Sequence, residues 1–437
     1  MGCGMGNGAL VDLMRSQGLF FLRKELHLIT GNATSKAKIQ IGVLFSVTGP
    51  YSTVGSEMLN GTLLAMQEVN DSSEYDFQLV PSIENPGGDL TQYRAFCENL
   101  VKGKRIPHVV GCYTSISRKE VIPIIEKHDA LLWYPSHYEG FESSSNVIYS
   151  GASPNQHIVP LAAYALGQYR PEVYCVGSNY IWAWENNRIL REMVTTCGGR
   201  IIAEKYLPIG SVDVEDVIAE IANTKPGFIF NTLIGESSYA LYRAYYREGA
   251  HNPRFDPSIM PITSCSLSEP ELLSIGDPAA GGHITSSVYF QSVPNPENAK
   301  FVARYKAQFG RDRVTSADAE ASYIATLLLA MAIRRAGTTD SQQVKKALYQ
   351  CKLQAPQGVV WIDPDNNHCY LTPRLGRSID NGRFSIFAVA SAPAKPDPYL
   401  VWFDALEITA DGRVRTEGED EVGSLREPRR RHLRLVK

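Results

Sequence analysis

The chain has 437 residues, of which 44% are hydrophobic and 20% are charged, a composition typical of ordinary globular domains. Its 43 basic and 46 acidic residues give a formal net charge of -3, without the basic surplus that usually accompanies direct binding to DNA or RNA. The length is sufficient for two lobes, each with its own hydrophobic core.

The two ends of the chain are predicted to lie outside the folded body. Residues 1–37 read as a disordered leader, because their one strongly apolar run, Leu19 to Leu22, is too short for a secretory signal or a membrane span. Residues 406–437 read as a solvated charged tail. A cytoplasmic location is therefore the default expectation. A periplasmic or extracytoplasmic location is the alternative if the start of the chain is misassigned.

The eight cysteines are scattered along the chain and form no C-x-x-C pair. Several lie inside apolar runs, where a thiol behaves as a small buried hydrophobic group. We favour free thiols over disulfides, and we expect no metal site and no cofactor because the cysteine spacing matches no zinc pattern.

From Lys38 onward, short apolar runs alternate with amphipathic segments, which is the pattern of parallel sheets covered by helices on both faces. Helices are predicted after Thr48, between the third and fourth strands, at 213–223 and at 317–336. After Gln357, turn residues dominate and predict β structure. The predicted strands are 39–45, 77–83, 109–110, 130–133, 173–177, 201–207, 228–233, 260–264 and 284–290.

The predicted helix at 317–336 is apolar nearly all round and should be buried. It is not expected to span a membrane, because Glu320 and Arg334 bound an apolar stretch shorter than about 20 residues.

Two polar and aromatic clusters follow predicted strands. The first runs from Gly111 to Ser115 (GCYTS) and the second from Tyr134 to Glu142 (YPSHYEGFE). In an α/β sheet, ligands bind where such strands end. Ser117 and Glu120 have the spacing of a capping box, which predicts free backbone N–H groups beside the first cluster. The sequence therefore predicts a site for a small polar ligand.

Catalysis is not expected at these clusters. His137 has no nucleophile or carboxylate partner beside it and is interpreted as a hydrogen-bonding rim residue. Glu139 and Glu142 lie on one loop, whereas glycosidic chemistry needs carboxylates that face each other across a ligand. A hydrolase that uses Cys112 stays a third alternative, although no basic residue adjoins that cysteine in the sequence.

Several segments, in order, carry a resemblance that covers roughly residues 39–405. They are residues 42–49 (GVLFSVTG), 85–89 (NPGGD), the two clusters, 153–156 (SPNQ) and 355–358 (APQG). The chain resembles proteins of the periplasmic-binding-protein type 1 fold. Within that fold it is similar to the branch that holds the amide-binding negative regulator of the aliphatic amidase operon and the urea and short-chain amide substrate-binding proteins of ABC transporters.

The resemblance implies an α/β protein of two doubly wound parallel-sheet lobes, joined by three crossovers, with a ligand cleft that closes between them. The crossovers are expected near Asn155, Tyr289 and Ala355. The N-terminal lobe would then hold residues 38–155 and 289–355, and the C-terminal lobe residues 156–288 and 356–405.

The resemblance also implies which side chains meet the ligand. In the regulator, the residues that match Ser136 and His137 are threonine and proline, and tyrosine stands in place of Trp182, so the particular amide, or urea, stays open. Gly235 and Glu236 begin a predicted helix and offer backbone donors or a carboxylate, although a helix cap explains them equally well. The candidate site residues are Tyr113, Thr114, Ser115, Tyr134, Ser136, His137, Tyr138, Tyr180, Trp182, Gly235 and Glu236.

The function implied by the resemblance is that of a small-amide sensor that regulates amidase expression through lobe closure and the release of a protein partner, an RNA-binding antiterminator. The alternative is an extracytoplasmic substrate-binding protein whose partner is an ABC permease. No arginine or lysine lies in GCYTS, YPSHYEGFE or residues 177–185 (GSNYIWAWE), which disfavours ligands with an α-carboxylate. Homo-oligomer formation stays open.

Overall fold

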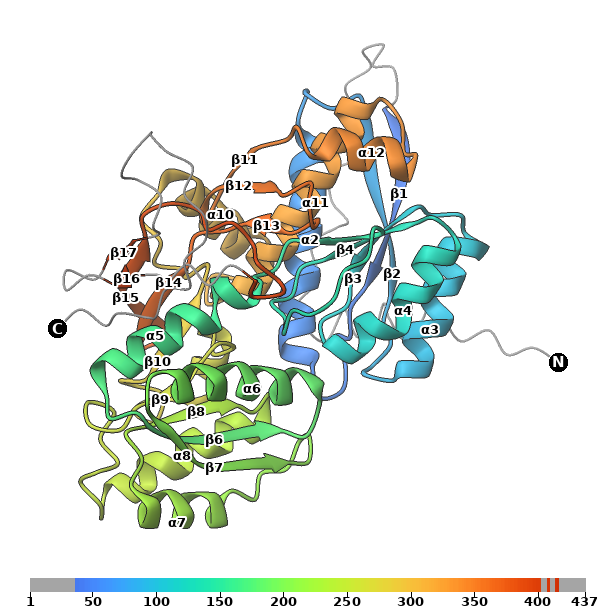
Figure 1. Ribbon diagram of the computed structural model, residues 1–437. Helices are drawn as coiled ribbons and strands as arrows, with labels where there is room; N and C mark the ends of the chain where they lie inside the picture. The colour runs from blue at the N-terminus through green and yellow to red at the C-terminus, as the bar shows by residue number, and fades with distance from the viewer. Residues whose placement is uncertain (1–35, 402–406, 409–412, 416–437) are drawn as a thin grey trace, which may run out of the picture.

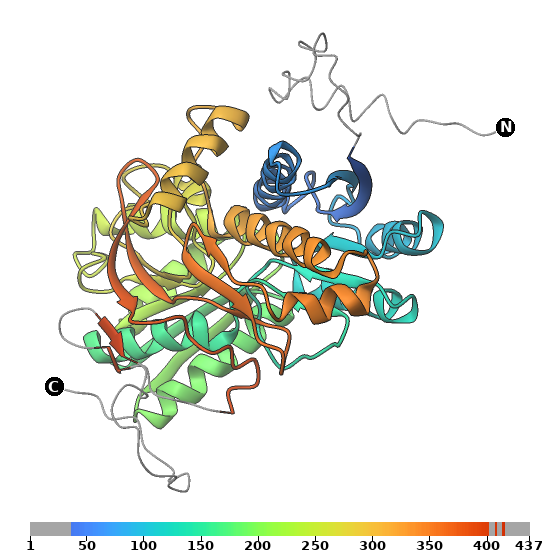
Figure 2. The same ribbon diagram turned by 90° about the horizontal axis from the view of Figure 1, so that it is seen from above.

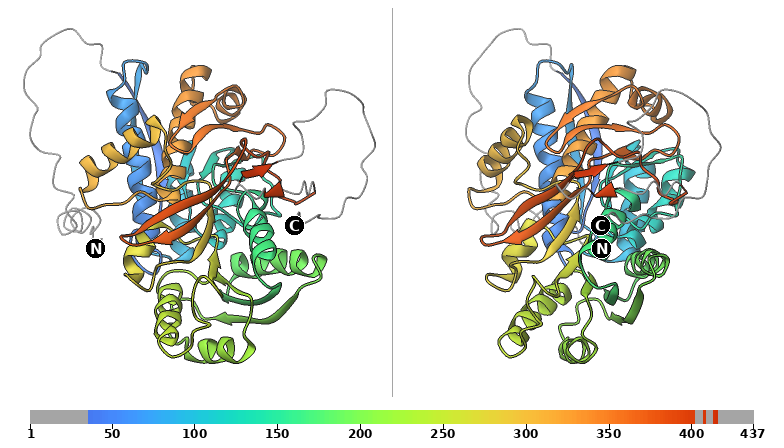
Figure 3. Two further views of the ribbon diagram at one scale, coloured as in Figure 1. Left: turned by 90° about the vertical axis from the view of Figure 1, so that its left-hand side faces the viewer. Right: turned by 60° about the vertical axis from the view of Figure 1, so that its left-hand side comes forward.

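The computed structural model describes residues 36–401, 407–408 and 413–415, which form two α/β lobes, one above the other in Figure 1. The first lobe is built on a five-stranded sheet and the second on a nine-stranded sheet. Helices cover both faces of each sheet, as Figure 3 shows from two further directions, so the predicted fold class is confirmed.

The first sheet is entirely parallel and has the order β2-β1-β3-β4-β5. The strand order reverses between β1 and β3, so the loops that follow these two strands lead to helices on opposite faces of the sheet. A crevice therefore opens between the two loops. The strands are β1 (Ala37–Leu44), β2 (Phe77–Glu84), β3 (His108–Gly111), β4 (Leu131–Tyr134) and β5 (Val147–Tyr149). The helices among them are α2 (Ser52–Asp71), α3 (Leu90–Glu98), the π-helical turn η1 (Asn99–Gly103) and α4 (Ser115–Lys127).

Alternation along β4 shows how the faces of this sheet are covered. Leu131 and Trp133 pack in a core with α2 and α11 (Ala317–Ala336), whereas Leu132 and Tyr134 pack on the opposite face with α3 and α4. The long buried helix predicted at 317–336 is thus confirmed as α11.

Helices α2 and α11 lie side by side, in blue and orange in Figure 2, at a very close approach. A Cβ atom on Gly61 of α2 would stand 2.0 Å from the carbonyl oxygen of Ala319. Only glycine leaves room there, so the two helices meet backbone to backbone.

The second sheet has the order β16-β17-β15-β14-β10-β9-β8-β6-β7 and is parallel from β7 to β10. Its strands are β6 (Glu172–Ser178), β7 (Arg200–Leu207), β8 (Phe228–Thr232), β9 (Ile262–Ser264), β10 (Ile284–Ser287), β14 (Arg374–Ile379), β15 (Arg383–Ala390), β16 (Glu407–Ile408) and β17 (Arg413–Arg415). Two of these strands, β16 and β17, lie in the expected charged tail. The expected leader lies outside the described residues, except that Lys36 is described and Ala37 opens β1.

The helices of the second lobe follow the same two-faced arrangement. Val173 and Cys175 of β6 face α5 and α6, and Tyr174 and Val176 face α7, α8 and α9. These helices are α5 (Ile158–Gln168), α6 (Ile181–Thr196), α7 (Glu215–Thr224), α8 (Glu236–Gly249) and α9 (Glu269–Ile275), with the 3-10 turn η2 (Pro154–Gln156) before α5.

The chain passes between the sheets in three stretches: from β5 to α5, from β10 to α10, and from β13 to β14. The expected crossovers near Asn155 and Tyr289 fall in the first two. The third lies later than Ala355, because Val360 and Ile362 of β12 pack in the core of the first lobe. The remaining elements are α10 (Pro296–Phe309), α12 (Ser341–Leu348), β11 (Leu353–Ala355), β12 (Gly358–Ile362) and β13 (Cys369–Tyr370).

Helix α4 begins two residues before the predicted capping box. Thr114 is its N-cap, and the Thr114 hydroxyl oxygen accepts a hydrogen bond from the Ser117 backbone N–H at 3.2 Å. The predicted cap at Ser117 is therefore wrong, because an earlier hydroxyl already satisfies that donor. The free N–H groups at the start of α4 consequently lie even closer to the first cluster.

The structure also bears on the predicted free cysteines and on the possibility of a membrane-spanning helix. The cysteines among the described residues are free, and all of them except Cys197 are buried. Within the same residues, no helix combines the length and the apolar character needed to cross a bilayer.

A buried cation holds the loop after β4 against α4. The Arg118 guanidinium lies 3.1 Å from Glu139 and 2.7 Å from Glu142, and its carbon is 4.7 Å from the ring centroids of both Tyr134 and Tyr138. The pairing of Glu139 and Glu142 is thus structural: both carboxylates face Arg118. Losing one partner of such a buried pair is costly, because it leaves a charge without compensation.

We expect Glu142→Gln to lower the free energy of unfolding at pH 7 by about 3 kcal/mol. Burial would raise the pKa of Glu142, but Arg118 and Lys119 lower it to about 2. Because the unfolded chain has a glutamate pKa of about 4.3, this stabilisation is complete above about pH 5 and is lost as the pH falls toward 2. Chemical denaturation between pH 2 and 7 would measure both effects.

The control is Glu120→Gln, which removes an exposed ion pair with Arg94 and should change stability by less than about 1 kcal/mol. A Glu142→Gln variant with the stability and pH profile of the unaltered protein would contradict the structural role of this ion pair.

Candidate functional site

A hollow of about 220 Å³, part of it open to solvent, lies between the lobes at the carboxyl ends of the parallel strands. We call it the cleft pocket. Four of its lining residues come from the first lobe and four from the second. They are Tyr113, Ser115, Ser136 and His137, and Tyr180, Trp182, Ile234 and Ser266.

Three helices begin at the cleft pocket. Tyr113 follows β3, after Cys112 turns the chain at a φ of 66°, and leads directly into α4. Tyr180 is the N-cap of α6, and Ile234 precedes α8. The first N–H groups of a helix have no partner within the helix and carry a partial positive charge. Helix N-termini from both lobes therefore lie at the pocket.

The two lobes touch across the pocket. The ring centroid of Trp182 is 5.5 Å from that of His137, and Tyr51 of the first lobe packs on the Tyr180 and Trp182 cluster of the second. Tyr51 also meets Tyr113 edge to face, with centroids 5.9 Å apart. This arrangement is that of a closed cleft with aromatic walls.

The cleft pocket is electrically neutral and rich in donors. None of its lining residues is acidic, and the pKa of His137 is lowered to about 3 by burial and by His157, so its ring is uncharged at neutral pH. Burial raises the pKa of Tyr113 and Tyr180, which keeps both hydroxyls protonated. The indole N–H of Trp182 is buried and has no hydrogen-bond partner among the described residues.

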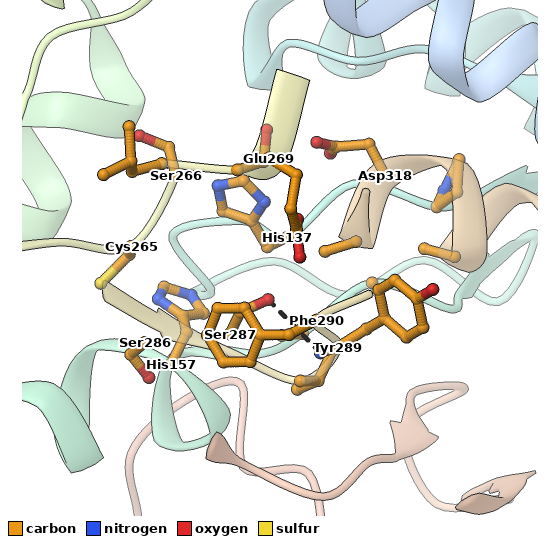
Figure 4. Close-up of a pocket in the computed structure, with 18 residues that line it drawn as sticks. His137, His157, Cys265, Ser266, Glu269, Ser286, Ser287, Tyr289, Phe290 and Asp318 are labelled. Atoms are coloured by element: carbon orange, nitrogen blue, oxygen red, sulfur yellow. Dashed lines mark hydrogen bonds between the residues drawn. The ribbon is translucent and has the colours of Figure 1, made fainter. Parts of the chain in front are cut away.

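A larger hollow of about 510 Å³ adjoins the cleft pocket and shares His137 and Ser266 with it (Figure 4). We call it the chamber. It contains two buried carboxyl groups, Glu269 from α9 of the second lobe and Asp318 from α11 of the first. The site as a whole therefore combines a pocket without acidic lining residues and a chamber with two buried carboxyl groups.

Six of the eleven predicted site residues line the cleft pocket, and three others serve the scaffold. Thr114 caps α4. The hydroxyl of Tyr134 donates to the Tyr113 carbonyl oxygen at 2.8 Å, and the hydroxyl of Tyr138 lies 2.5 Å from His368 Nε2. Both rings are fully buried against Arg118, so they support the loops without lining the pocket.

The remaining two predicted residues lie at the start of α8. The Glu236 side chain is 67% exposed and lies 4.0 Å from Arg243. Gly235 has a φ of 57°, and a Cβ there would stand 3.4 Å from the Pro50 carbonyl oxygen of the other lobe. Glycine is favoured by this backbone, and its position lets the lobes approach each other.

Two lining residues were not predicted. Ile234 follows β8 and Ser266 follows β9, so the strand-end rule applied to the second lobe would have found both. Nothing in the local sequence of Glu269 or Asp318 marks them as neighbours, since they come from distant helices.

The described residues offer no catalytic or metal-binding constellation. Burial raises the pKa of the Cys112 thiol well above its ordinary value, the opposite of what an activated nucleophile needs. Within the described ranges, no group of three or more His, Cys, Asp or Glu side chains could hold a metal ion.

Comparison with solved structures finds the same fold in transport proteins. A solute-binding protein of an ABC transporter from R. palustris, in complex with 4-hydroxybenzoate, has a TM-score of 0.72 at 19% identity, covering 82% of this chain and 98% of that one. For a leucine-binding protein from Thermotoga maritima, the TM-score is 0.69 at 19% identity, with 80% and 98% covered. An ABC transporter substrate-binding protein from Sphaerobacter thermophilus gives 0.70 at 21% identity, with 80% and 96% covered.

One sequence match points elsewhere but is short. A limonene hydroxylase from Geobacillus stearothermophilus is 32% identical over 126 residues, which are 29% of this chain and 23% of that protein. The chain thus spans less than a quarter of the hydroxylase, and this match carries no argument for its activity here.

The family is shown by a model that matches most of the chain. The model is described as a periplasmic binding protein domain and matches residues 39–404, close to the range of the resemblance. The family and the structural neighbours are binding proteins and not enzymes. The chain therefore belongs to the periplasmic binding protein family.

Proposed function

We propose that the protein is a substrate-binding protein that closes its two lobes over a small uncharged solute, a short amide or urea, and delivers it to an ABC transporter. The observation that carries this proposal is the neutral, donor-rich cleft pocket between the lobes. The transport proteins among the structural neighbours support the role in delivery.

The chemistry of the pocket favours a carbonyl group without a negative charge. Tyrosine hydroxyls, the Trp182 indole and helix N-termini can all donate to a carbonyl oxygen. A carboxylate would be expected to meet an arginine or lysine, and none lines the pocket. The cleft pocket is small and is enclosed by only eight lining residues, so a solute of few heavy atoms fits best.

A role in delivery implies an extracytoplasmic location and a permease as the partner. The resemblance of the motifs to an amide-responsive regulator supports a second use of the same closure, in which a cytoplasmic protein partner is released. In that case an inducing amide must weaken the partner complex by the same factor by which the partner weakens amide binding.

Calorimetry with acetamide, propionamide, butyramide and urea tests the ligand class. Acetamide has four heavy atoms, so its binding can reach about -6 kcal/mol, a dissociation constant of tens of micromolar. Leucine, benzoate and 4-hydroxybenzoate serve as carboxylate controls. Tight binding of one of these acids, without heat from any amide or urea, would refute the proposed ligand class.

Fractionation of the native host and co-purification test the role. Recovery with permease components from an extracytoplasmic fraction is the expected result. A cytoplasmic protein that co-purifies only in the absence of amide would instead establish the regulator.

Tyr113→Phe should weaken amide binding by about 1 kcal/mol, roughly fivefold, because it removes one donor hydroxyl and leaves the ring in place. Calorimetry with the best-binding amide measures the loss. The matched control is Tyr246→Phe, since Tyr246 is exposed on α8, and it should bind like the unaltered protein. Equal affinities in both variants would show that the Tyr113 hydroxyl does not contact the ligand.

Trp182→Tyr should shift the preference of the pocket toward longer amides. The smaller ring leaves room for a further methylene, which is worth about 1 to 3 kcal/mol in a fitted apolar site. The ratio of butyramide to acetamide affinity is the measurement. Trp184→Tyr is the control, because the Trp184 side chain is exposed two residues farther along α6. An unchanged ratio in a folded Trp182→Tyr protein would mean that the indole does not limit the pocket.

A further inference from the structure

The chamber adjoins the cleft pocket and differs from it in containing acidic side chains. Figure 4 shows His137, Glu269 and Asp318 gathered at one side of it, opposite Ser287 and Tyr289. Its lining includes two carboxyl groups, whereas no acidic residue lines the cleft pocket.

The two carboxyl groups of the chamber are buried without a cation. Glu269 and Asp318 are 1% and 6% exposed, and among the described residues neither forms an ion pair. The single contact of Glu269 with a backbone donor outside its own helix is to the Gln291 N–H at 2.7 Å. Burial without a cation disfavours the ionised form of both groups, so a positive partner placed beside them would stabilise that form.

A third acceptor is independent of the carboxyl groups. His157 Nε2 lies 3.0 Å from the Tyr138 carbonyl oxygen, and because a carbonyl can only accept, Nε2 carries the proton. Nδ1 is then a lone-pair acceptor, buried in the chamber wall without a partner. Burial lowers the pKa of His157 to about 4, so the ring stays neutral under physiological conditions. Ser286, also in the wall, has a buried hydroxyl without a partner.

We propose that the chamber is a second subsite, which takes the protonated amino group of a ligand whose carbonyl end lies in the cleft pocket. An ammonium group binds by donating N–H hydrogen bonds, and Glu269, Asp318 and His157 Nδ1, which all line the chamber, can each accept one. The preferred solutes are then short amides that carry a primary amine and no carboxylate. This assignment rests on the proposed function only for the placement of the amide end.

Calorimetry on the full-length chain, with matched pairs of ligands, tests the subsite. The pairs are acetamide with glycinamide, propionamide with β-alaninamide, and butyramide with 4-aminobutanamide. A hydrogen-bonded charge is worth about ten- to hundredfold in affinity, so at least one amino amide should bind more tightly than its neutral partner by that factor. Affinities equal within each pair at pH 8.5 would overturn the assignment.

Glu269→Gln and Asp318→Asn remove one charge each with little change of shape. In either variant the ratio of amino-amide to neutral-amide affinity should fall toward one. Asp216→Asn, on the exposed side of α7, is the control and should keep the ratio of the unaltered protein. Ratios that persist in both chamber variants would place the amino group elsewhere.

The pH dependence gives a readout that does not depend on the variants. Burial raises the pKa of Glu269 to about 8 and that of Asp318 to about 7. Glu271 of α9 and Glu57 of α2 add negative charge near Asp318, and the two chamber histidines are neutral above about pH 5. The affinity for β-alaninamide and 4-aminobutanamide, whose amines stay largely protonated, should therefore rise from pH 6 to 8.5, while that of neutral amides stays level.

The outcomes separate this inference from the proposed function. Binding of neutral amides without any gain from the amino group would refute the subsite and leave the proposed function intact. Binding of methylamine that is lost in Glu269→Gln and Asp318→Asn, without binding of neutral amides, would support the subsite and refute the amide class.

Discussion

The buried guanidinium of Arg118 is the constraint around which the first-lobe side of the cleft is organised. A charge without water must find compensation inside the protein, and here two carboxylates and two aromatic rings provide it. As a result, Tyr134 and Tyr138 are committed to the scaffold. The Ser115 hydroxyl is likewise engaged, because it donates to Glu139. Tyr113, which follows β3, is thereby left with His137 to present the polar side chains of this lobe to a ligand.

Closure of the lobes assembles two environments that neither lobe has alone. The neutral pocket takes its aromatic walls from the loops after β3, β4 and β6, and the chamber takes one acid from each lobe. In the proposed subsite, the two buried acids and His157 lie apart from the Trp182 indole and the helix N-termini at the cleft pocket. Such a separation selects the orientation of a bound molecule as well as its identity, since an inverted ligand would face donors with donors.

Local patterns predicted the parallel strands of both sheets, because most of these strands contain short apolar runs. The long helix at 317–336 and the strand end that carries Tyr113 needed nothing beyond such patterns, whereas Tyr180 was assigned through the resemblance. Tyr134 could have been placed better: it lies two residues after Leu132 in β4, so alternation puts its side chain on the same helix-covered face. The chamber could not be predicted, since His157, Glu269 and Asp318 meet only through the packing of distant segments.

The interleaving of the two lobes has a consequence for the order in which the protein can form. Tyr305 of α10 donates a hydrogen bond to Glu57 of α2, 248 positions earlier in the chain, and Gln156 at the first crossover donates to the Ala394 carbonyl oxygen, 238 positions later. A ribosome must therefore release nearly the whole polypeptide before either lobe can complete its core. Contacts between such distant positions slow folding and leave unpaired strand edges exposed meanwhile. Nascent chains of this protein should accordingly depend on protection from aggregation until the last strands of the second sheet emerge.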